Sequence, residues 1–121
     1  MLPPMKRDLD SLTAAIVAFR DDRDWAQFHN PKDLALSLVL EAGEVLEHMQ
    51  WANGEALAQR LHERKEAVGE ELSDVLYYTL LLAHDLGIDL SGAFAAKMAK
   101  NAQKYPVEKA RGSSKKYTEL D

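Results

Sequence analysis

Residues that interrupt helices are scarce in this chain of 121 residues, which contains four prolines and six glycines. No proline lies between Pro31 and Pro106. Proline removes a backbone hydrogen-bond donor and glycine costs backbone entropy, so both concentrate at the turns that a sheet protein needs in number. Their scarcity therefore favours a few long helices.

Apolar residues recur at helical spacing in four long segments. The pattern predicts helices over about residues 9–22, 32–51, 63–86 and 89–104, with a short helical piece over 55–61. Pro31 suits a first helical position, and Asn53-Gly54 suits the end of the second helix. Gly87 and Pro106 should stop the last two helices. We therefore expect an all-α fold that resembles a four-helix bundle.

At this length the helices should form a single domain, residues 1–121, with a core over about 9–106. The polar tail 107–121 lacks helical periodicity, and we expect it to be loose or to dock on another subunit. The helix over 63–86 is apolar nearly all round, so part of its surface needs a further cover. A homodimer or homotetramer would provide that cover.

Composition excludes several classes of protein. The net charge of −5 argues against a protein that binds nucleic acid polymers independently of sequence. The absence of cysteine excludes disulfides and thiolate metal sites. No run of about 18 apolar residues and no signal peptide is present, so we expect no membrane association and a cytoplasmic protein.

Two expected helices each carry a pair of acids three residues apart: Glu41 with Glu44, and Glu71 with Asp74. Each pair lies within about 60° on one helical face, because an α-helix has 3.6 residues per turn. Leucines and valines flank both pairs on that face. The acids therefore interrupt apolar surfaces, which is unusual for side chains that serve only solubility.

An antiparallel hairpin centred on residues 57 and 58 would bring the two acid pairs opposite each other. Four such carboxylates would repel and lose hydration unless they took up protons or bound a cation. An all-oxygen set of ligands suits Mg²⁺, or Mn²⁺, better than zinc. The competing interpretation is that these are solvated surface acids without a metal, which is common at this spacing.

Four stretches of the chain carry a resemblance to a known family: FRDDRDWAQFH, LALSLVLEAGEVLEHMQW, EELSDVLYYTLLLAHDLGIDL and KMAKNAQKYP. Together they cover most of residues 19–106. In this order they resemble the MazG-like superfamily of all-α NTP pyrophosphohydrolases, and within it the branch of small dCTP pyrophosphatases. The resemblance implies a helical homo-oligomer that uses Mg²⁺ to hydrolyse a (deoxy)nucleoside triphosphate to the monophosphate and pyrophosphate.

The resemblance also implies roles for single residues. The family's catalytic metal ligands are matched by Glu41, Glu44, Glu71 and Asp74. Aromatic residues near the nucleotide are matched by Trp25, Trp51 and Tyr78. Residues that approach the phosphates or the sugar are matched by Lys97, Asn101 and Tyr105. The chain departs from many relatives at Leu40, where they have a glutamate directly before the first ligand.

These roles agree with the chemistry, since metal ions neutralise a triphosphate and activate water without a nucleophilic side chain. Each role has a structural alternative. The three aromatic residues either stack on a nucleobase or fill the core. Lys97 and Asn101 share a helical face that meets the phosphates or is simply solvated. His48, one turn beyond Glu44, either orients a metal ligand or is an ordinary helix residue.

The leading hypothesis is an Mg²⁺-dependent pyrophosphohydrolase of dCTP or a modified pyrimidine deoxynucleotide. One alternative is a hydrolase that removes dUTP or aberrant nucleotides. The other is a non-catalytic helical interaction module, in which the acids are structural and the apolar helices associate.

Overall fold

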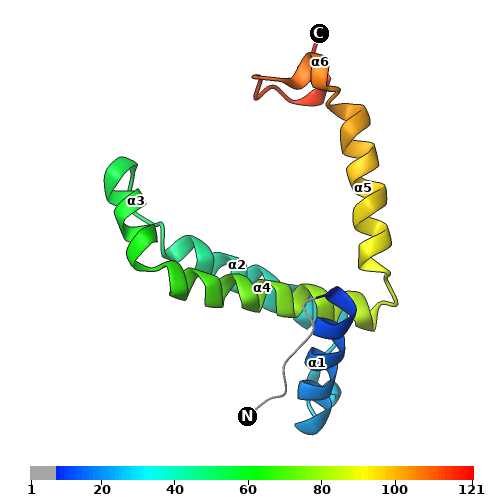
Figure 1. Cartoon of the computed structure of the whole chain (residues 1–121). Helices are drawn as coiled ribbons and strands as arrows, with labels where there is room; N and C mark the ends of the chain where they lie inside the picture. The colour runs from blue at the N-terminus through cyan, green and yellow to red at the C-terminus, as the bar shows by residue number, and fades with distance from the viewer. Residues whose placement is uncertain (1–7) are drawn as a thin grey trace. The chain divides into compact units, whose positions relative to one another are not determined.

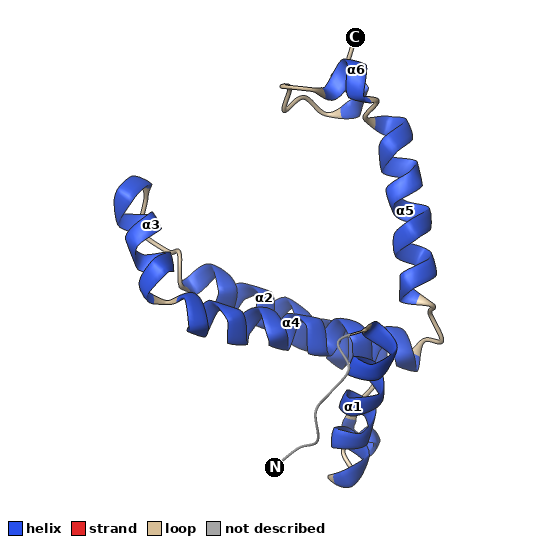
Figure 2. Ribbon diagram, in the orientation of Figure 1, coloured by secondary structure: helices blue, strands red, loops and turns tan. Residues whose placement is uncertain are grey.

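The computed structural model describes residues 8–121, and every regular element in that range is a helix (Figures 1 and 2). The α-helices are α1 (Leu9–Asp22), α2 (Pro31–Glu47), α3 (Gly54–Glu63), α4 (Lys65–Asp85), α5 (Leu90–Lys104) and α6 (Val107–Ala110). The 3₁₀ helices are η1 (Ala26–Phe28) and η2 (Tyr117–Glu119). The predicted all-α fold class is confirmed. None of the helices within residues 8–121 carries an apolar stretch that could cross a bilayer.

The chain divides into two compact units, Met1–Gly87 and Ile88–Asp121. In the described part of the first unit, α2 lies along α4, α1 packs against α4, and α3 contacts α4 as well. The second unit contains α5, α6 and η2. The single domain and the four-helix bundle therefore stay predictions, because they require α5 to pack with the first unit.

Local signals in the sequence set the starts of α2 and α5. The Asn30 side chain accepts a hydrogen bond of 2.9 Å from the backbone N–H of Asp33, and Pro31 occupies the first turn of α2. The Asp89 carboxylate accepts one of 3.2 Å from the N–H of Gly92 at the start of α5. Both caps satisfy amide groups that a helix start leaves without a partner. Gly87 follows α4 with a positive φ of 67°, as predicted for a helix stop.

The predicted end of the second helix was wrong, because α2 stops at Glu47 and not near Trp51. Beyond Glu47 the hydrogen bonds tighten to a three-residue spacing, as in the 2.9 Å bond from the Met49 N–H to the Leu46 carbonyl. Trp51 then adopts a left-handed φ of 68°. Asn53 and Gly54, expected to end α2, are instead the N-cap and first residue of α3. Asparagine and glycine suit an N-cap as well as a helix stop, so these residues alone did not distinguish the two.

A small core holds the first unit together. Leu34 of α2 is 1% exposed, and Leu80 and Leu81 of α4 are 2% and 0% exposed. Nearby, the buried Arg20 guanidinium of α1 donates two hydrogen bonds to the Asp85 carboxylate of α4, at 2.7 and 2.8 Å. This paired contact ties the end of α1 to the end of α4. Helical periodicity did not indicate it, since it joins residues 65 positions apart.

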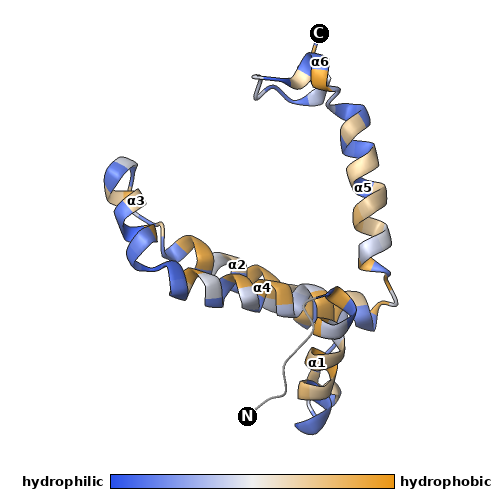
Figure 3. Ribbon diagram, viewed as in Figure 1, coloured by the Kyte–Doolittle hydropathy of each residue, from blue (hydrophilic) through white to orange (hydrophobic). Residues whose placement is uncertain are grey.

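Much apolar surface remains uncovered on α2 and α4, where Figure 3 shows hydrophobic residues along both helices. The large apolar side chains concerned are 40–66% exposed: Leu36, Val39, Leu40, Leu46, Leu72 and Leu76. Isolated exposed leucines are normal, but a run along two packed helices is typical of a surface that another protein surface covers.

The tail has more local structure than its lack of periodicity suggested. Residues 107–121 contain α6 and η2, and the Tyr117 ring meets the Tyr105 ring edge-on at 6.1 Å. The Lys104 ammonium lies 4.9 Å from the centre of the Tyr117 ring. Elements of three or four residues are too short to produce a periodic pattern, which explains the difference. Docking of the tail on another subunit stays a prediction.

Candidate functional site

Three of the four predicted metal ligands come together where α2 lies along α4. Glu41 and Glu44 of α2 and Glu71 of α4 each offer a carboxylate oxygen, and the three oxygens lie within 4.8 Å of one another. Glu41 and Glu71 are half-buried, whereas Glu44 is exposed. Among residues 8–121, no Lys or Arg side chain forms an ion pair with any of the three. We refer to these three residues as the acid cluster.

The close approach of the carboxyl groups in the acid cluster opposes their ionisation. Burial, followed by the neighbouring Glu44 carboxyl, raises the pKa of Glu41 to about 7. The Glu44 carboxyl, followed by burial, raises the pKa of Glu71. Like charges held close together without a counter-ion favour protonation of one member of the group. The acid cluster is therefore strained at neutral pH in the absence of a cation.

Asp74, the fourth predicted ligand, lies further out. Its side chain is exposed, and its carboxylate is not among the oxygens that lie within 4.8 Å of one another. Its negative charge nevertheless contributes to raising the pKa of Glu41, so it acts on the acid cluster over a longer distance. A role for Asp74 as a metal ligand stays a prediction.

The residues present suit a divalent metal ion that prefers oxygen. The Oε2 atom of Glu41 is buried and has no hydrogen-bond partner among the described residues. A buried carboxylate oxygen without a partner is costly, and a bound cation would relieve that cost. Three carboxylates without thiolate or imidazole ligands fit Mg²⁺ or Mn²⁺ better than zinc.

His48 is the one basic side chain of residues 8–121 that lies within 4.0 Å of an acid-cluster carboxylate. Its Nε2 atom lies 3.6 Å from the Oε1 atom of Glu71. This contact favours the charged form of Glu71 and opposes the stronger effects of Glu44 and burial on the Glu71 pKa.

Two of the three predicted aromatic residues lie at the ends of a chain of edge-to-face ring contacts. The distances between ring centroids are 5.8 Å from Trp25 to Phe19, 6.3 Å from Phe19 to Tyr77, and 5.0 Å from Tyr77 to Tyr78. Trp25 precedes η1 and is 41% exposed, while Tyr78 is half-buried on α4. Phe19 and Tyr77 were not among the predicted site residues, although Tyr77 directly precedes Tyr78 and Phe19 lies six positions before Trp25.

Trp51 lies apart from these contacts, in the turn between α2 and α3. Its side chain is 90% exposed, and its backbone has the left-handed φ of 68° noted above. Core filling is therefore wrong for Trp51. A bulky residue rarely adopts this conformation, and such strain is often found where a side chain has a functional task.

The three predicted phosphate or sugar residues, Lys97, Asn101 and Tyr105, lie on or directly after α5 in the second unit. Lys97 is exposed and Asn101 is half-buried.

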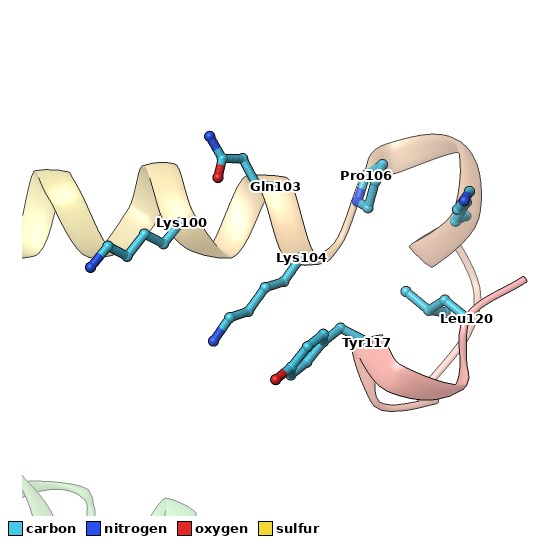
Figure 4. A pocket seen from close by; sticks show the side chains of 7 residues that line it. Lys100, Gln103, Lys104, Pro106, Tyr117 and Leu120 are labelled. Carbon is cyan, nitrogen blue, oxygen red and sulfur yellow. The ribbon is translucent and has the colours of Figure 1, made fainter.

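The second unit carries seven Lys and Arg against four Asp and Glu, a net charge of +3, whereas the whole chain carries −5. A cavity of about 440 Å³ in this unit is lined by Lys100, Lys104 and Lys109 (Figure 4). These lysines were not among the predicted site residues, although Lys100 and Lys104 follow Lys97 at helical spacing on α5.

Comparison with known proteins identifies the family. Residues 36–120 match the model of the MazG-like family. The chain is 45% identical to dCTP pyrophosphatase 1 of Homo sapiens and 44% identical to that of Rattus norvegicus, in each case over 119 residues, which are 97% of this chain and 68% of the relative. A crystal structure of a pyrophosphatase from Archaeoglobus fulgidus has a TM-score of 0.78 and 36% identity, and covers 88% of this chain and 99% of its own.

These relatives confirm the resemblance to the dCTP pyrophosphatase branch and the predicted enzyme class, a nucleoside triphosphate pyrophosphatase. They contradict the hypothesis of a non-catalytic interaction module. With a family model that matches most of its length and relatives that align over nearly all of it, the chain belongs to the MazG-like family.

Proposed function

We propose that this protein hydrolyses a deoxynucleoside triphosphate between its α and β phosphates in the presence of Mg²⁺, with Mn²⁺ as a substitute. The products are the monophosphate and pyrophosphate, and the preferred substrate is dCTP or a modified pyrimidine deoxynucleotide. The single observation that carries the proposal is the convergence of Glu41, Glu44 and Glu71 with no neutralising Lys or Arg among residues 8–121. The names of the curated relatives support dCTP.

In this proposal the acid cluster, together with Asp74, holds the divalent ion and is the catalytic centre. When bound, the ion neutralises phosphate charge and lowers the pKa of a water molecule. Phosphoryl transfer needs positioning and electrostatic stabilisation more than a nucleophilic side chain. The raised pKa of Glu41 supports this assignment, because perturbed carboxyl groups are concentrated at functional sites.

The aromatic and α5 residues have separate tasks in the proposal. Trp25, Trp51 and Tyr78 are the candidates for stacking on the nucleobase, and the high exposure of Trp51 leaves its ring free to do so. Lys97, Asn101 and Tyr105 would approach the phosphates or the sugar. The net positive charge of the second unit supports an anionic partner for that unit.

We also propose that the protein acts as a homodimer or homotetramer, in which a second copy covers the exposed apolar residues of α2 and α4. Six large side chains along these two helices are at least 40% exposed, which supports an interface between protein chains. A nucleotide pocket could then draw residues from two copies. The cytoplasmic location expected from the sequence stays a prediction.

The experiment that tests the function is product analysis with a panel of triphosphates. Pure protein is incubated with each standard dNTP, dUTP and 5-methyl-dCTP, with Mg²⁺ or with EDTA, and nucleotide and phosphate products are separated. We expect dCMP and pyrophosphate from dCTP, and no product in EDTA. Faster turnover of dUTP or a modified nucleotide would favour the alternative substrates, and release of orthophosphate would contradict the proposed cleavage site.

A matched pair of variants links turnover to the acid cluster. Glu71→Gln removes a carboxylate of the cluster, whereas Glu70→Gln removes an exposed carboxylate at the adjacent position of α4. We expect the first variant to lose nearly all turnover and the second to keep it. Equal activity in the two variants would contradict the proposed metal site.

A further inference from the structure

His48 occupies a distinct position at the end of α2, one turn beyond Glu44. Its Nε2 atom lies 3.6 Å from the Oε1 atom of Glu71 on the neighbouring helix α4. The His48 side chain is 19% exposed and that of Glu71 is 23% exposed. The contact therefore crosses the interface of the two helices that carry the acid cluster, and it is largely shielded from solvent.

The His48 backbone lies in the tightened turn that closes α2, where its N–H donates a hydrogen bond of 3.3 Å to the carbonyl of Val45. The Nδ1 atom is buried and has no hydrogen-bond partner among residues 8–121. A polar ring that is buried at a cost, with one nitrogen without a partner, is not explained by packing alone. The nitrogen that faces a charged group is Nε2, which lies towards Glu71.

The geometry indicates how Nε2 can act on Glu71. A separation of 3.6 Å is slightly longer than a hydrogen bond, so a small side-chain rotation is enough to form one. A carboxylate has two oxygens, and a hydrogen bond to Oε1 fixes the orientation of the group while Oε2 stays free for a cation. Carboxylates that ligate metals are commonly oriented by such an outer partner.

We infer that His48 is a positioning residue of the acid cluster: its Nε2–H donates to Glu71 and turns the free Glu71 oxygen towards the cation that Glu41 and Glu44 share. The inference rests on the proposed function, because it presupposes a divalent ion at the acid cluster. It adds a residue that touches neither the ion nor the nucleotide but sets the affinity of the site. A histidine that only filled space at this position would leave metal affinity unchanged.

The experiment measures metal affinity directly, without turnover. Mn²⁺ is titrated into the full-length protein at one fixed pH, and the free ion is followed by its electron paramagnetic resonance signal. The variants are His48→Leu, which keeps apolar volume, and His48→Gln, whose amide nitrogen reaches the place of Nε2. His62→Leu, an exposed histidine of α3, is the control. Melting curves in EDTA show which variants fold, and His48→Met replaces the leucine variant if that one does not.

We expect the leucine or methionine variant to bind Mn²⁺ about tenfold more weakly than wild type, with His48→Gln restored to near the wild-type affinity. Wild-type affinity in the leucine variant would overturn the inference, and so would equal weakening in both His48 variants. The proposed metal site itself is judged separately, on the wild-type titration. If wild-type protein binds no Mn²⁺, that site fails and the role of His48 fails with it.

Discussion

Glu41→Gln should make the metal-free protein more stable above neutral pH, although it removes a side chain of the proposed active site. Glutamine has nearly the same shape as a protonated glutamate and never carries a charge. The wild-type carboxyl must ionise beside Glu44 and Glu71, with its Oε2 atom buried and without a hydrogen-bond partner in the described part of the chain. The variant avoids this repulsion and this loss of hydration.

The structure gives the size and the pH range of the effect. Glu41 has a pKa of 4.5 in the unfolded chain and about 7 in the folded one, so folding favours its protonated form. The resulting stability is fully present below pH 4.5 and is lost as the pH rises through about 7. The full difference corresponds to about 3 kcal/mol. Solvent screening of this partly exposed group reduces the expected gain to about 1–2 kcal/mol at pH 8.

The assay is urea unfolding in EDTA at pH 4.5 and pH 8, at a single protein concentration so that association does not shift the midpoint. Glu70→Gln, which removes an exposed charge outside the acid cluster, is the control. We expect Glu41→Gln to exceed wild type at pH 8 and to match it at pH 4.5, while the control matches wild type at both. A Glu41→Gln variant that is no more stable than wild type at pH 8 would refute the reasoning.

Magnesium should reverse this order. An ion that binds only the folded protein stabilises wild type by about 2.7 kcal/mol at a concentration one hundred times its dissociation constant. Glu41→Gln lacks one of the ligands and should gain much less. The same urea series with Mg²⁺ in place of EDTA measures the difference, and equal gains in both proteins would argue against Glu41 as a ligand.

Three further predictions concern other parts of the chain. Arg20→Met should lower the free energy of unfolding, measured with urea, by about 2 kcal/mol, because it leaves the Asp85 carboxylate without its partner. The double variant with Asp85→Leu should recover most of this loss. Trp51→Asn should reduce kcat/KM about 5- to 150-fold through lost stacking yet melt no lower than wild type, since asparagine tolerates a left-handed φ; unchanged kinetics would exclude Trp51 from the nucleotide site. Leu36→Lys, on the exposed apolar face of α2, should shift sedimentation velocity profiles towards the monomer, whereas a monomeric wild type would contradict the proposed assembly.

The positions of the helices followed from the sequence because their causes are local. The prolines, the Asn30 and Asp89 caps and the Gly87 stop act within a few residues of the backbone that they shape. The acid cluster was also predictable. In an antiparallel hairpin the apolar faces of the two helices pack against each other, and the i, i+3 acid pairs on those faces then lie close together. The end of α2 was not, because Asn53-Gly54 fits a helix start as well as a helix end.

Tertiary structure alone decided the contacts between distant residues. The Arg20–Asp85 pair, the aromatic contacts from Trp25 to Tyr78 and the approach of His48 to Glu71 all join separate helices. Each depends on the rotation of one helix about its axis relative to the next. Helical periodicity shows which residues lie on the same side of a helix. It does not show which residues of a neighbouring helix will pack against that side. The sequence therefore determined which carboxylates are available, and packing decided which of them converge.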